Sequence, residues 1–559
     1  MSEAVEVLMP ITPVAKVHRS LPGLHFRKLL LGTTTSFNRT KSRLPHVPLL
    51  ISVIGLLFTS QAFAGWVRQY PGTGGGLGSA YAVAVDDSGY VYVAGVSYPP
   101  GSNGEMTTIK YSGSGDTVWV RRYGGSGVGP AVAYDLELDP AGNVLVAGKS
   151  SGIGYSDMTT IKYSPTGDTL WVRRFSGGHV DGEWAKSIDV DADANVYVTG
   201  PSRAANNGDD YLTIKYSPVG DTLWTRRYNG PGNGGDMPWD MVVDEGGNVY
   251  VTGGVSGDSL TDSDIGTVKY LPNGDTGWVR LYNGPASWID GGYAVAVSDS
   301  GFVYVAGVAY GNAVEDYATI KYSADGDTIW VRYYDNGSAD YSWDLVVDNA
   351  GNVIVTGMSK SAANGWRFAT VKYTPAGDTI WTRRYEDFGG SAEALTVDDS
   401  GCVYVTGRIY GATADGDILT IKYSPAGDTE WQRRYNGPAN KNDLGISVVA
   451  DLSANVYVVG WVDGWWASHM VTIKYSNCAM VISGDLTGDE LVTSADVITL
   501  VNYVFKSGPE PQPCAAAGDA DCTGNVTSSD IIHMVNYVFK GGPSPCDVCT
   551  LIPGTWPCP

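Results

Sequence analysis

The fold is decided by Thr213-Ile214-Lys215-Tyr216, a short turn, and then Trp224-Thr225-Arg226-Arg227-Tyr228, because variants of this stretch recur along most of the chain. The recurrent tryptophans are Trp66, Trp119, Trp171, Trp224, Trp278, Trp330, Trp381 and Trp431. Their spacing of about 50 residues is typical of the blades of a β-propeller.

One repeat, taken from residue 239 onward, contains four strand-like segments. Residues 241–244 and 249–253 are β-rich and flank a short Asp/Gly/Asn turn, which predicts a hairpin. After a longer polar loop, residues 267–270 and 278–282 flank a second tight turn. Since no helical periodicity lies between these segments, each repeat predicts an antiparallel four-stranded blade.

The repeats are offset relative to the chain. The strand of Trp66 has no Thr-Ile-Lys-Tyr before it, and the last Thr-Ile-Lys-Tyr, at 472–475, has no Trp-x-Arg after it. A first and a last segment that complete one blade would close the ring and pair the exposed strand edges. We therefore expect an all-β, eight-bladed propeller over residues 65–477, with seven blades as the alternative.

The segments 316–322 and 224–231 resemble the bacterial β-propeller repeats called SBBP, and the resemblance covers about residues 66–476. It implies a secreted or surface protein and little chemistry. Residues that recur in every blade are then architectural, with Lys–acid or Arg–acid pairing between blades. The acids of this set are Glu105, Asp157, Asp210, Asp264, Asp316 and Asp417.

The amino-terminal residues 1–64 are typical of an export signal. A long basic region precedes an apolar stretch at about 49–58 and an Ala62-Phe63-Ala64 cleavage site. We expect a secreted, extracellular or surface-associated bacterial protein with no transmembrane anchor after cleavage. An uncleaved anchor is the alternative, and the length of the basic region suggests a start downstream of Met1.

The charge and the cysteines agree with export. The formal net charge is −22, without a basic run in the mature part, which argues against a nucleic-acid ligand. Cys402 lies in a strand-like run and is expected to be a buried free thiol. The other cysteines crowd the carboxyl end, where disulfides are favoured over zinc or redox chemistry. They are Cys478, Cys514, Cys522, Cys546, Cys549 and Cys558, the last three in a Cys/Pro-rich tail at 546–559.

A duplicated segment near the carboxyl end has the spacing of calcium loops, with oxygen ligands at alternate positions before an amphipathic helix. The first loop offers Asp485, Thr487, Asp489, Leu491 (carbonyl), Thr493 and Asp496. The second offers Asp519, Asp521, Thr523, Asn525 (carbonyl), Thr527 and Asp530. Two structural calcium ions are expected.

With one helix after each loop and Asp at loop position 12, residues 480–545 resemble a dockerin type I domain. The resemblance implies an all-α module that binds a cohesin-type partner or a cell-surface component through Ser494, Ala495, Ser528 and Ser529. Glu490 and Thr523 depart from the pattern, so a calcium-stiffened cap is the alternative.

The variable connections between strands are the expected place for a propeller site, because the two long sets emerge on one face and carry aromatic residues. These are Trp184, Trp288, Trp366, Trp461, Trp465 and Trp466, with Tyr98, Tyr155 and Tyr310. Aromatic residues also begin the innermost strand in five repeats, at Tyr81, Tyr134, Trp239, Tyr293 and Trp343. Acids follow them at Asp135, Asp240 and Asp344, where they could bind a cation or act as a carboxylate pair.

The sequence favours a secreted, non-catalytic binding or scaffold protein whose propeller face binds a carbohydrate or a protein, and whose carboxyl module docks in a calcium-dependent way. No catalytic residue is assigned, because no H-E-x-x-H or P-loop motif occurs. The alternative is an extracellular polysaccharide-degrading enzyme, a glycoside hydrolase or lyase, that carries a dockerin. A purely structural surface protein is a third possibility.

Overall fold

The structure is a computed structural model, and its described part comprises most of the repeat region and two carboxyl-terminal helices. The described residues are 65–70, 77–127, 129–152, 155–177, 182–203, 208–257, 263–286, 288–311, 314–361, 365–387, 389–410, 415–463, 468–476, 494–506 and 527–540. The expected export signal, most of the calcium loops, the cysteine-rich tail, Trp465 and Trp466 lie outside them.

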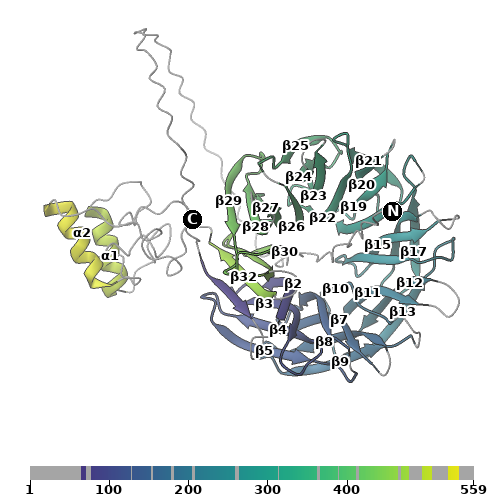
Figure 1. The fold of residues 1–559 in the computed structure, drawn as a ribbon, viewed down its shortest axis with the longest axis horizontal. Helices are drawn as coiled ribbons and strands as arrows, with labels where there is room; N and C mark the ends of the chain where they lie inside the picture. Colours follow the sequence, from purple (N-terminus) through teal and green to yellow (C-terminus); the bar gives the residue numbers. More distant parts are fainter. Residues whose placement is uncertain are drawn as a thin grey trace, which may run out of the picture. The chain divides into compact units, whose positions relative to one another are not determined.

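The described strands form eight four-stranded antiparallel sheets, which are the blades of a propeller (Figure 1). Blade 1 contains β2 (Leu77–Val85), β3 (Val91–Tyr98), β4 (Glu105–Tyr111) and β5 (Thr117–Tyr123). Blade 2 contains β6 (Val132–Leu138), β7 (Val144–Ser151), β8 (Ser156–Tyr163) and β9 (Thr169–Phe175). Blade 3 contains β10 (Ser187–Val190), β11 (Val196–Arg203), β12 (Asp209–Tyr216) and β13 (Thr222–Tyr228). Blade 4 contains β14 (Met237–Val243), β15 (Val249–Ser256), β16 (Ser263–Tyr270) and β17 (Thr276–Tyr282).

The remaining blades follow the same plan, except for the last. Blade 5 contains β18 (Gly291–Val297), β19 (Val303–Tyr310), β20 (Glu315–Tyr322) and β21 (Thr328–Tyr334). Blade 6 contains β22 (Asp340–Val347), β23 (Val353–Ser361), β24 (Gly365–Tyr373) and β25 (Thr379–Arg384). Blade 7 contains β26 (Gly390–Val397), β27 (Val403–Tyr410), β28 (Gly416–Tyr423) and β29 (Thr429–Tyr435). Blade 8 contains β30 (Leu444–Ala450), β31 (Val456–Val462), β32 (His469–Tyr475) and, from the other end of the repeat region, β1 (Val67–Tyr70).

Blade 8 closes the ring. Strand β1 pairs antiparallel with β32, with Val67 opposite Ile473 and Tyr70 opposite Met470. The first strand of each sheet, beginning with β2 and ending with β30, contacts the first strand of the next sheet all the way around, so these strands line the centre (Figure 1). The prediction of eight blades with the two ends sharing one is therefore confirmed.

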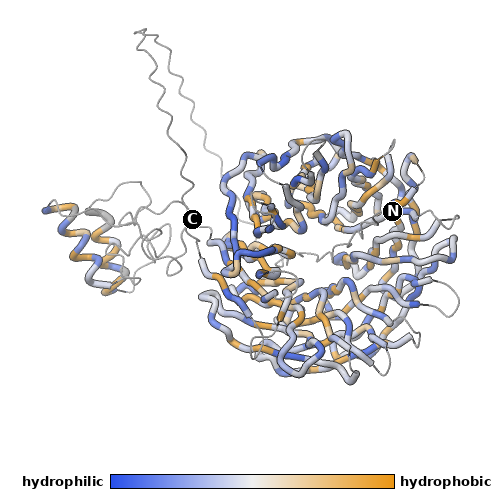
Figure 2. Tube along the Cα trace, viewed as in Figure 1, coloured by the Kyte–Doolittle hydropathy of each residue, from blue (hydrophilic) through white to orange (hydrophobic). Residues whose placement is uncertain are grey.

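The apolar residues of the strands pack between blades (Figure 2). The second strands, such as β3, are buried almost throughout, because both faces of each sheet are covered by a neighbouring blade. In each cluster a tryptophan of an outermost strand packs against the next blade. Trp171, 7% exposed, lies with Ile188 and Tyr216 of blade 3, and its ring centroid is 6.0 Å from that of Tyr216. Cys402 is also buried and unpaired, as expected.

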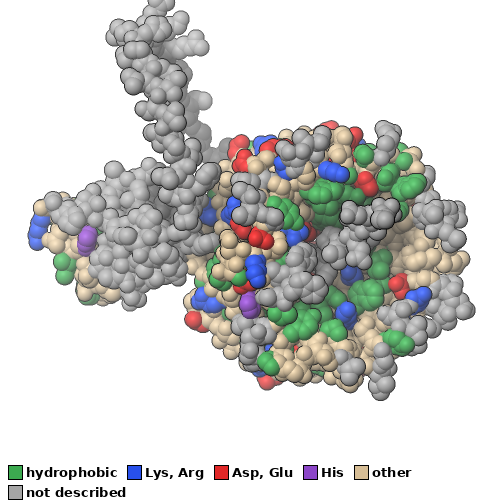
Figure 3. Space-filling view, in the orientation of Figure 1, with side chains coloured by type: hydrophobic (Ala, Val, Ile, Leu, Met, Phe, Trp, Pro, Cys, Tyr) green, Lys and Arg blue, Asp and Glu red, His purple; other side chains and the backbone are tan. Residues whose placement is uncertain are grey.

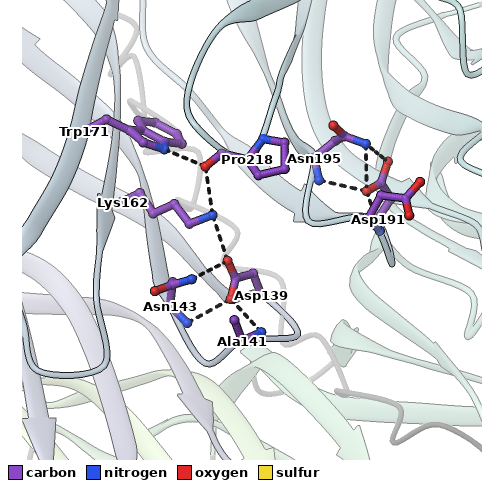
Figure 4. Close-up of polar contacts among 9 residues, drawn as sticks. Asp139, Ala141, Asn143, Lys162, Trp171, Asp191, Asn195 and Pro218 are labelled. Atoms are coloured by element: carbon purple, nitrogen blue, oxygen red, sulfur yellow. Dashed lines mark hydrogen bonds and ion pairs between the residues drawn. The ribbon is translucent and has the colours of Figure 1, made fainter.

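Polar side chains of the third and outermost strands of blade 2 donate hydrogen bonds to a turn of blade 3 (Figure 4). Trp171 Nε1 donates a hydrogen bond to the carbonyl of Pro218 at 3.1 Å, and Arg173 Nε donates to the carbonyl of Gly220 at 2.5 Å. Lys162 Nζ donates to the same Pro218 carbonyl at 3.2 Å and pairs with Asp139 of its own blade at 2.8 Å. We call the Trp, Arg and Lys groups at such a junction the outer clamp.

The outer clamp recurs around the ring. The tryptophan hydrogen bonds run from Trp66 to Gly113, Trp119 to Pro165, Trp171 to Pro218, Trp224 to Pro272, Trp278 to Ala324, Trp330 to Pro375 and Trp381 to Pro425. Among the described residues, Trp431 Nε1 has no such acceptor, because the two outer strands of blade 8 come from opposite ends of the chain and no turn joins them.

The expected ion pairs form within blades, which corrects the expectation that they join neighbouring blades. Lys162 pairs with Asp139, and Arg174 pairs with Asp157 at 2.6 Å, all in blade 2. Arg227 likewise pairs with Asp210 at 3.1 Å in blade 3. Neighbouring blades are joined instead by hydrogen bonds to turn carbonyls, which a strand sequence does not reveal.

Helices α1 (Ser494–Lys506) and α2 (Ser528–Lys540) pack on each other through Val497, Leu500 and Met534. The helices begin at Ser494 and Ser528, two of the residues expected to bind a partner. Ser528 and Ser529 are exposed.

Within the described residues, no helix is long and apolar enough to cross a membrane.

Candidate ligand-binding site

The long connections lie on one face of the ring. In an antiparallel blade, the connection from the second to the third strand and the connection to the next blade leave the same edge. We call this the loop face. Each innermost strand begins there, so its first residues line the loop-face end of the central opening. Figure 3 shows hydrophobic side chains interspersed with Lys and Arg around that centre.

Seven of the eight innermost strands are irregular near their loop-face ends. In blade 4, Pro238 is opposite Gly253 and Asp240 is opposite Thr252, so Trp239 is an extra residue, a β-bulge. The partner must be glycine, because a Cβ on Gly253 would lie 2.0 Å from the carbonyl oxygen of Met237. The glycines opposite the other innermost strands are equally close to a backbone carbonyl oxygen: Gly95, Gly148, Gly200, Gly307, Gly357, Gly407 and Gly460.

The seven bulge positions, together with Lys186, form what we call the inner belt. Its members, in blade order, are Tyr81, Tyr134, Lys186, Trp239, Tyr293, Trp343, Glu393 and Ile446. Lys186 directly precedes β10, and its N–H donates to the carbonyl of Thr199, the residue opposite Ser187. The sequence reasoning found the five aromatic members and missed Lys186, Glu393 and Ile446. Aligning each repeat on the glycine of its second strand would have found them.

Neighbouring belt side chains touch across blade boundaries. The rings of Tyr81 and Tyr134 are 5.9 Å apart. The ammonium of Lys186 lies 5.8 Å from the Tyr134 ring and 4.3 Å from the Trp239 ring, which are cation–π distances. Trp239 is in turn 5.8 Å from Tyr293. The belt is therefore continuous from blade 1 to blade 5.

The run of rings continues outward in blade 6. Tyr293 is 5.0 Å from Trp343, edge to face. Tyr341 stacks on Trp343 at 5.7 Å with 13° between the ring planes. Trp366, one of the predicted loop-face residues, is 5.5 Å from Tyr341, and Lys360 lies 5.7 Å from its ring. Trp343 itself is only 5% exposed, so the rings that this part of the belt and the loop face offer to a ligand are those of Tyr293, Tyr341 and Trp366.

Two lysines give the tyrosine side of the belt a positive charge. Burial, together with the nearby charge of Lys149, lowers the pKa of Lys186 to about 8. Burial also lowers the pKa of Lys149, whose ammonium is 5.9 Å from the Tyr134 ring. The ammonium group of Lys186 is charged at neutral pH or below, and the partial desolvation of both lysines strengthens their attraction for an anion.

The acids that follow the aromatic residues are buried, which corrects the expectation of a carboxylate pair or cation site at the channel mouth. Asp240 accepts hydrogen bonds from the backbone N–H of Met241 at 2.6 Å and of Val295 in the next blade at 2.9 Å. Asp135 accepts from Leu136 and from Ile188 of blade 3. Asp344 accepts from Leu345 and Leu395. These carboxylates fasten adjacent innermost strands together.

The other predicted aromatic residues differ in exposure. Trp288 is 57% exposed beside Tyr310, at 5.8 Å, whereas Trp461 is only 5% exposed. Trp461 therefore belongs to the core of blade 8 and does not offer a ring to a ligand. Trp184 is half-buried, and Tyr98 and Tyr155 are exposed.

Of the side chains in the two expected calcium loops, only those at the end of the second loop are described. Asp530 is buried at the start of α2, and its Oδ2 accepts a hydrogen bond from the Thr527 N–H at 2.7 Å. The two side chains expected to share a calcium ion therefore lie together, and their oxygen atoms suit that ion. The other proposed ligands lie outside the residues whose side chains are described.

Comparisons with known proteins define the class of the chain through its fold, that of the β-propellers. No protein-family model matches the sequence, and no curated protein matches it. Among solved structures, Sqt1 from Chaetomium thermophilum aligns with a TM-score of 0.51 at 10% identity, over 74% of this chain and 99% of that chain. A second structure of Chaetomium thermophilum Sqt1 aligns at 0.50 and 10% identity, over 75% of this chain and 98% of that one. At this identity the likeness concerns the fold alone.

Proposed function

We propose that the chain is a secreted, non-catalytic binding protein whose inner belt holds a carbohydrate chain, preferably an acidic one. The observation that carries the proposal is the unbroken run of side chains from Tyr81 to Trp366 at the loop-face end of the opening. Aromatic rings offer flat apolar faces against which the C–H faces of sugar rings can stack, and their polar edges hydrogen-bond to hydroxyls.

Two features favour an acidic sugar over a neutral one. Lys186 and Lys149 lie beside the rings of the belt, in a chain whose formal net charge is −22. Partly desolvated ammonium groups within an otherwise acidic protein supply local attraction for a carboxylate or sulfate on the sugar.

The burial of the belt acids supports binding over hydrolysis. A glycosidase needs two carboxyl groups that face the scissile bond. Asp240 and Asp344 instead each accept one backbone hydrogen bond from their own strand and one from the innermost strand of the next blade. The polysaccharide-degrading enzyme therefore stays the second candidate, without an observation that favours it.

The carboxyl-terminal helices support a separate docking function, which we assign to a dockerin-like module that binds calcium and a cohesin-type protein or a surface component. Both helices leave an isoleucine and a phenylalanine seven residues apart exposed. These are Ile498 and Phe505 on α1, at 62% and 66%, and Ile532 and Phe539 on α2, at 64% and 62%. Apolar side chains repeated at equivalent places on both helices suit a protein partner.

The test of the belt is calorimetric titration of the full mature chain with an acidic polysaccharide, such as polygalacturonate, and with a neutral glucan. We expect tighter binding of the acidic polymer and a loss of about 10- to 100-fold for Trp239→Ala. The matched control is Trp288→Ala, an exposed loop-face tryptophan off the belt, which should leave the affinity unchanged.

Three outcomes would count against the proposal. Equal binding by Trp239→Ala and the wild type would remove the belt from the site, and an effect confined to Trp288→Ala would move the site to the rim. Release of reducing ends, abolished by Asp240→Asn, would replace a binding function by catalysis.

A further inference from the structure

A pair of acids recurs at the junctions between blades near the loop face. One comes from the third strand of a blade and the other from the loop before the next innermost strand. In blade 3, Asp210 of the pair forms an ion pair with Arg227 at 3.1 Å, and Asp236 lies close enough to Asp210 for repulsion to act on its pKa. In blade 7, Asp417 pairs with Arg434 beside Asp443. An arginine of the outermost strand thus forms an ion pair with one acid of each of these two pairs.

Blade 5 keeps the acid pair and lacks the arginine. The pair is Asp316 of β20 and Asp340 at the start of β22. Tyr333 lies opposite Ala318, the register position at which Arg227 lies opposite Leu212 in blade 3. The positive charge that Arg227 and Arg434 supply in blades 3 and 7 is therefore absent from this position.

Blade 5 also adds a third carboxylate. Asp335 follows β21 at the place where blades 3 and 7 carry Asn229 and Asn436. Blade 4 also lacks the arginine, with Leu281 in its place, but keeps Asn283 here. Among blades 3, 4, 5 and 7, only blade 5 therefore lacks both the arginine and the asparagine.

The three carboxyl groups converge. Oxygen atoms of Asp316, Asp335 and Asp340 all lie within 4.8 Å of one another. Asp316 is 5% exposed and Asp340 is fully buried, whereas Asp335 is exposed to solvent. The buried Oδ1 of Asp316 accepts no hydrogen bond from any described residue. A buried carboxylate oxygen without a partner, in a side chain close to two other carboxylates, is costly unless something else balances their charge.

The surroundings do not supply a neutralising side chain. Among the described residues, no lysine or arginine forms an ion pair with any of the three acids. Arg384 of blade 6 acts on Asp340 at longer range, but its side chain pairs with Glu386 at 3.4 Å. Asn336 donates its backbone N–H to Asp340 Oδ2 at 2.8 Å, which orients that carboxylate without balancing its charge.

We propose that Asp316, Asp335 and Asp340 bind a divalent calcium ion at the junction of blades 5 and 6. The donor set consists of oxygen atoms only, and one ligand faces solvent, so water can complete the coordination that calcium requires. The ion takes the place of the arginine of blades 3 and 7. Magnesium fits less well, because it demands a stricter geometry and gives up its water reluctantly.

The pKa of Asp316 agrees with an unmet need for positive charge. Burial, followed by repulsion from Asp335, Asp340 and Glu315, raises it to about 7. Without a cation, this carboxyl group would hold a proton near neutral pH, which is the alternative way of relieving the repulsion.

Two variants of the full mature chain test the site, and both restore residues of the other blades. Asp335→Asn introduces the repeat asparagine at an exposed position, and Tyr333→Arg introduces the repeat arginine. Calcium bound per chain is measured after equilibrium dialysis, and the melting temperature is measured in calcium and in chelator. Each variant should lose one equivalent of calcium relative to the wild type, whatever the carboxyl-terminal loops bind.

The two variants are expected to differ in melting temperature in chelator, because only Tyr333→Arg adds a positive charge beside the acids. Tyr333→Arg should melt at a higher temperature than the wild type in chelator, because its guanidinium neutralises the acids, whereas Asp335→Asn should rise less. Unchanged calcium stoichiometry in both variants would overturn the proposal in favour of a protonated Asp316. Equal stabilisation of the wild type by magnesium would overturn the assignment to calcium. Polysaccharide binding is measured in parallel, so failure of the ion site is distinguishable from failure of the belt.

Discussion

The outer clamp and the inner belt lie in the same blades and follow opposite rules. At the outer clamp, the side chains of Trp171, Arg173 and Lys162 recur with little change, and their polar atoms bond to protein groups. At the belt, one structural position carries tyrosine, tryptophan, lysine, glutamate or isoleucine. A position that the fold needs keeps its residue type, whereas a position that the fold only presents to the central opening is available for a ligand.

The largest expected difference between the two regions is in stability. Trp171→Ala removes a buried ring and a hydrogen bond between blades and should lower the free energy of unfolding by about 3–5 kcal/mol. Trp239→Ala, from a half-buried belt residue, should cost about 1 kcal/mol or less. Chemical denaturation of the two variants measures this. Equal losses would mean that the belt is as structural as the clamp.

The buried carboxyl group of Asp344, which fastens β22 to β26, predicts a pH dependence of stability. Burial raises the pKa of Asp344 to about 8, against backbone hydrogen bonds that lower it, so the folded state holds a proton that the unfolded state has lost above about pH 4. Stability from this group is present at pH 4 and is lost as the pH rises toward 8. We expect a decrease on the order of 2 kcal/mol, measured by denaturation in chelator.

The control for this prediction is Asp344→Asn, which cannot ionise. Its stability should change less between pH 4 and 8 than that of the wild type, even if its stability at pH 4 is lower. Parallel curves for the two proteins would show that Asp344 does not contribute, and that other buried acids, such as Asp443, carry the whole slope.

The positive side of the belt predicts a smaller effect on binding. With a pKa of about 8, Lys186 loses its charge between pH 7 and 9, so affinity for an acidic polysaccharide should decrease by about tenfold over that range. Lys186→Met should bind weakly at both pH values. A neutral glucan is the control, and a pH dependence that persists in Lys186→Met would remove this lysine from the site.

The architecture could be predicted from the sequence because the same strand motifs recur eight times along it. The spacing from Trp66 to Trp431 and the offset at residues 472–475 fixed the blade number and the shared blade. The partners of the recurrent side chains could not be predicted in the same way. Lys162 and Trp171 both bond to the Pro218 carbonyl, and a backbone acceptor in another blade leaves no residue-specific signal.

The candidate site was predicted in part for a similar reason. The aromatic residues from Tyr81 to Trp343 were visible as a column in the repeats, whereas the bulge at Trp239 was not, because alternation does not reveal one extra residue. Asp240 was therefore expected to face a ligand, although it fastens β14 to β18. The acid cluster of blade 5 could be recognised only by comparing blades in three dimensions. Tyr333 stands where blade 3 has Arg227, and this position is on a different strand from Asp316.

The smallest predicted effect isolates one hydrogen bond of the clamp. Trp171→Phe keeps most of the buried ring and removes the bond to the Pro218 carbonyl, which should cost about 1 kcal/mol more than Trp431→Phe. Trp431 is the matched control because it packs against Tyr475 in the same way, at 5.6 Å, beside the blade that has no clamp turn. Equal costs, measured by denaturation, would mean that the clamp stabilises the ring through packing alone and that the turn carbonyls contribute nothing.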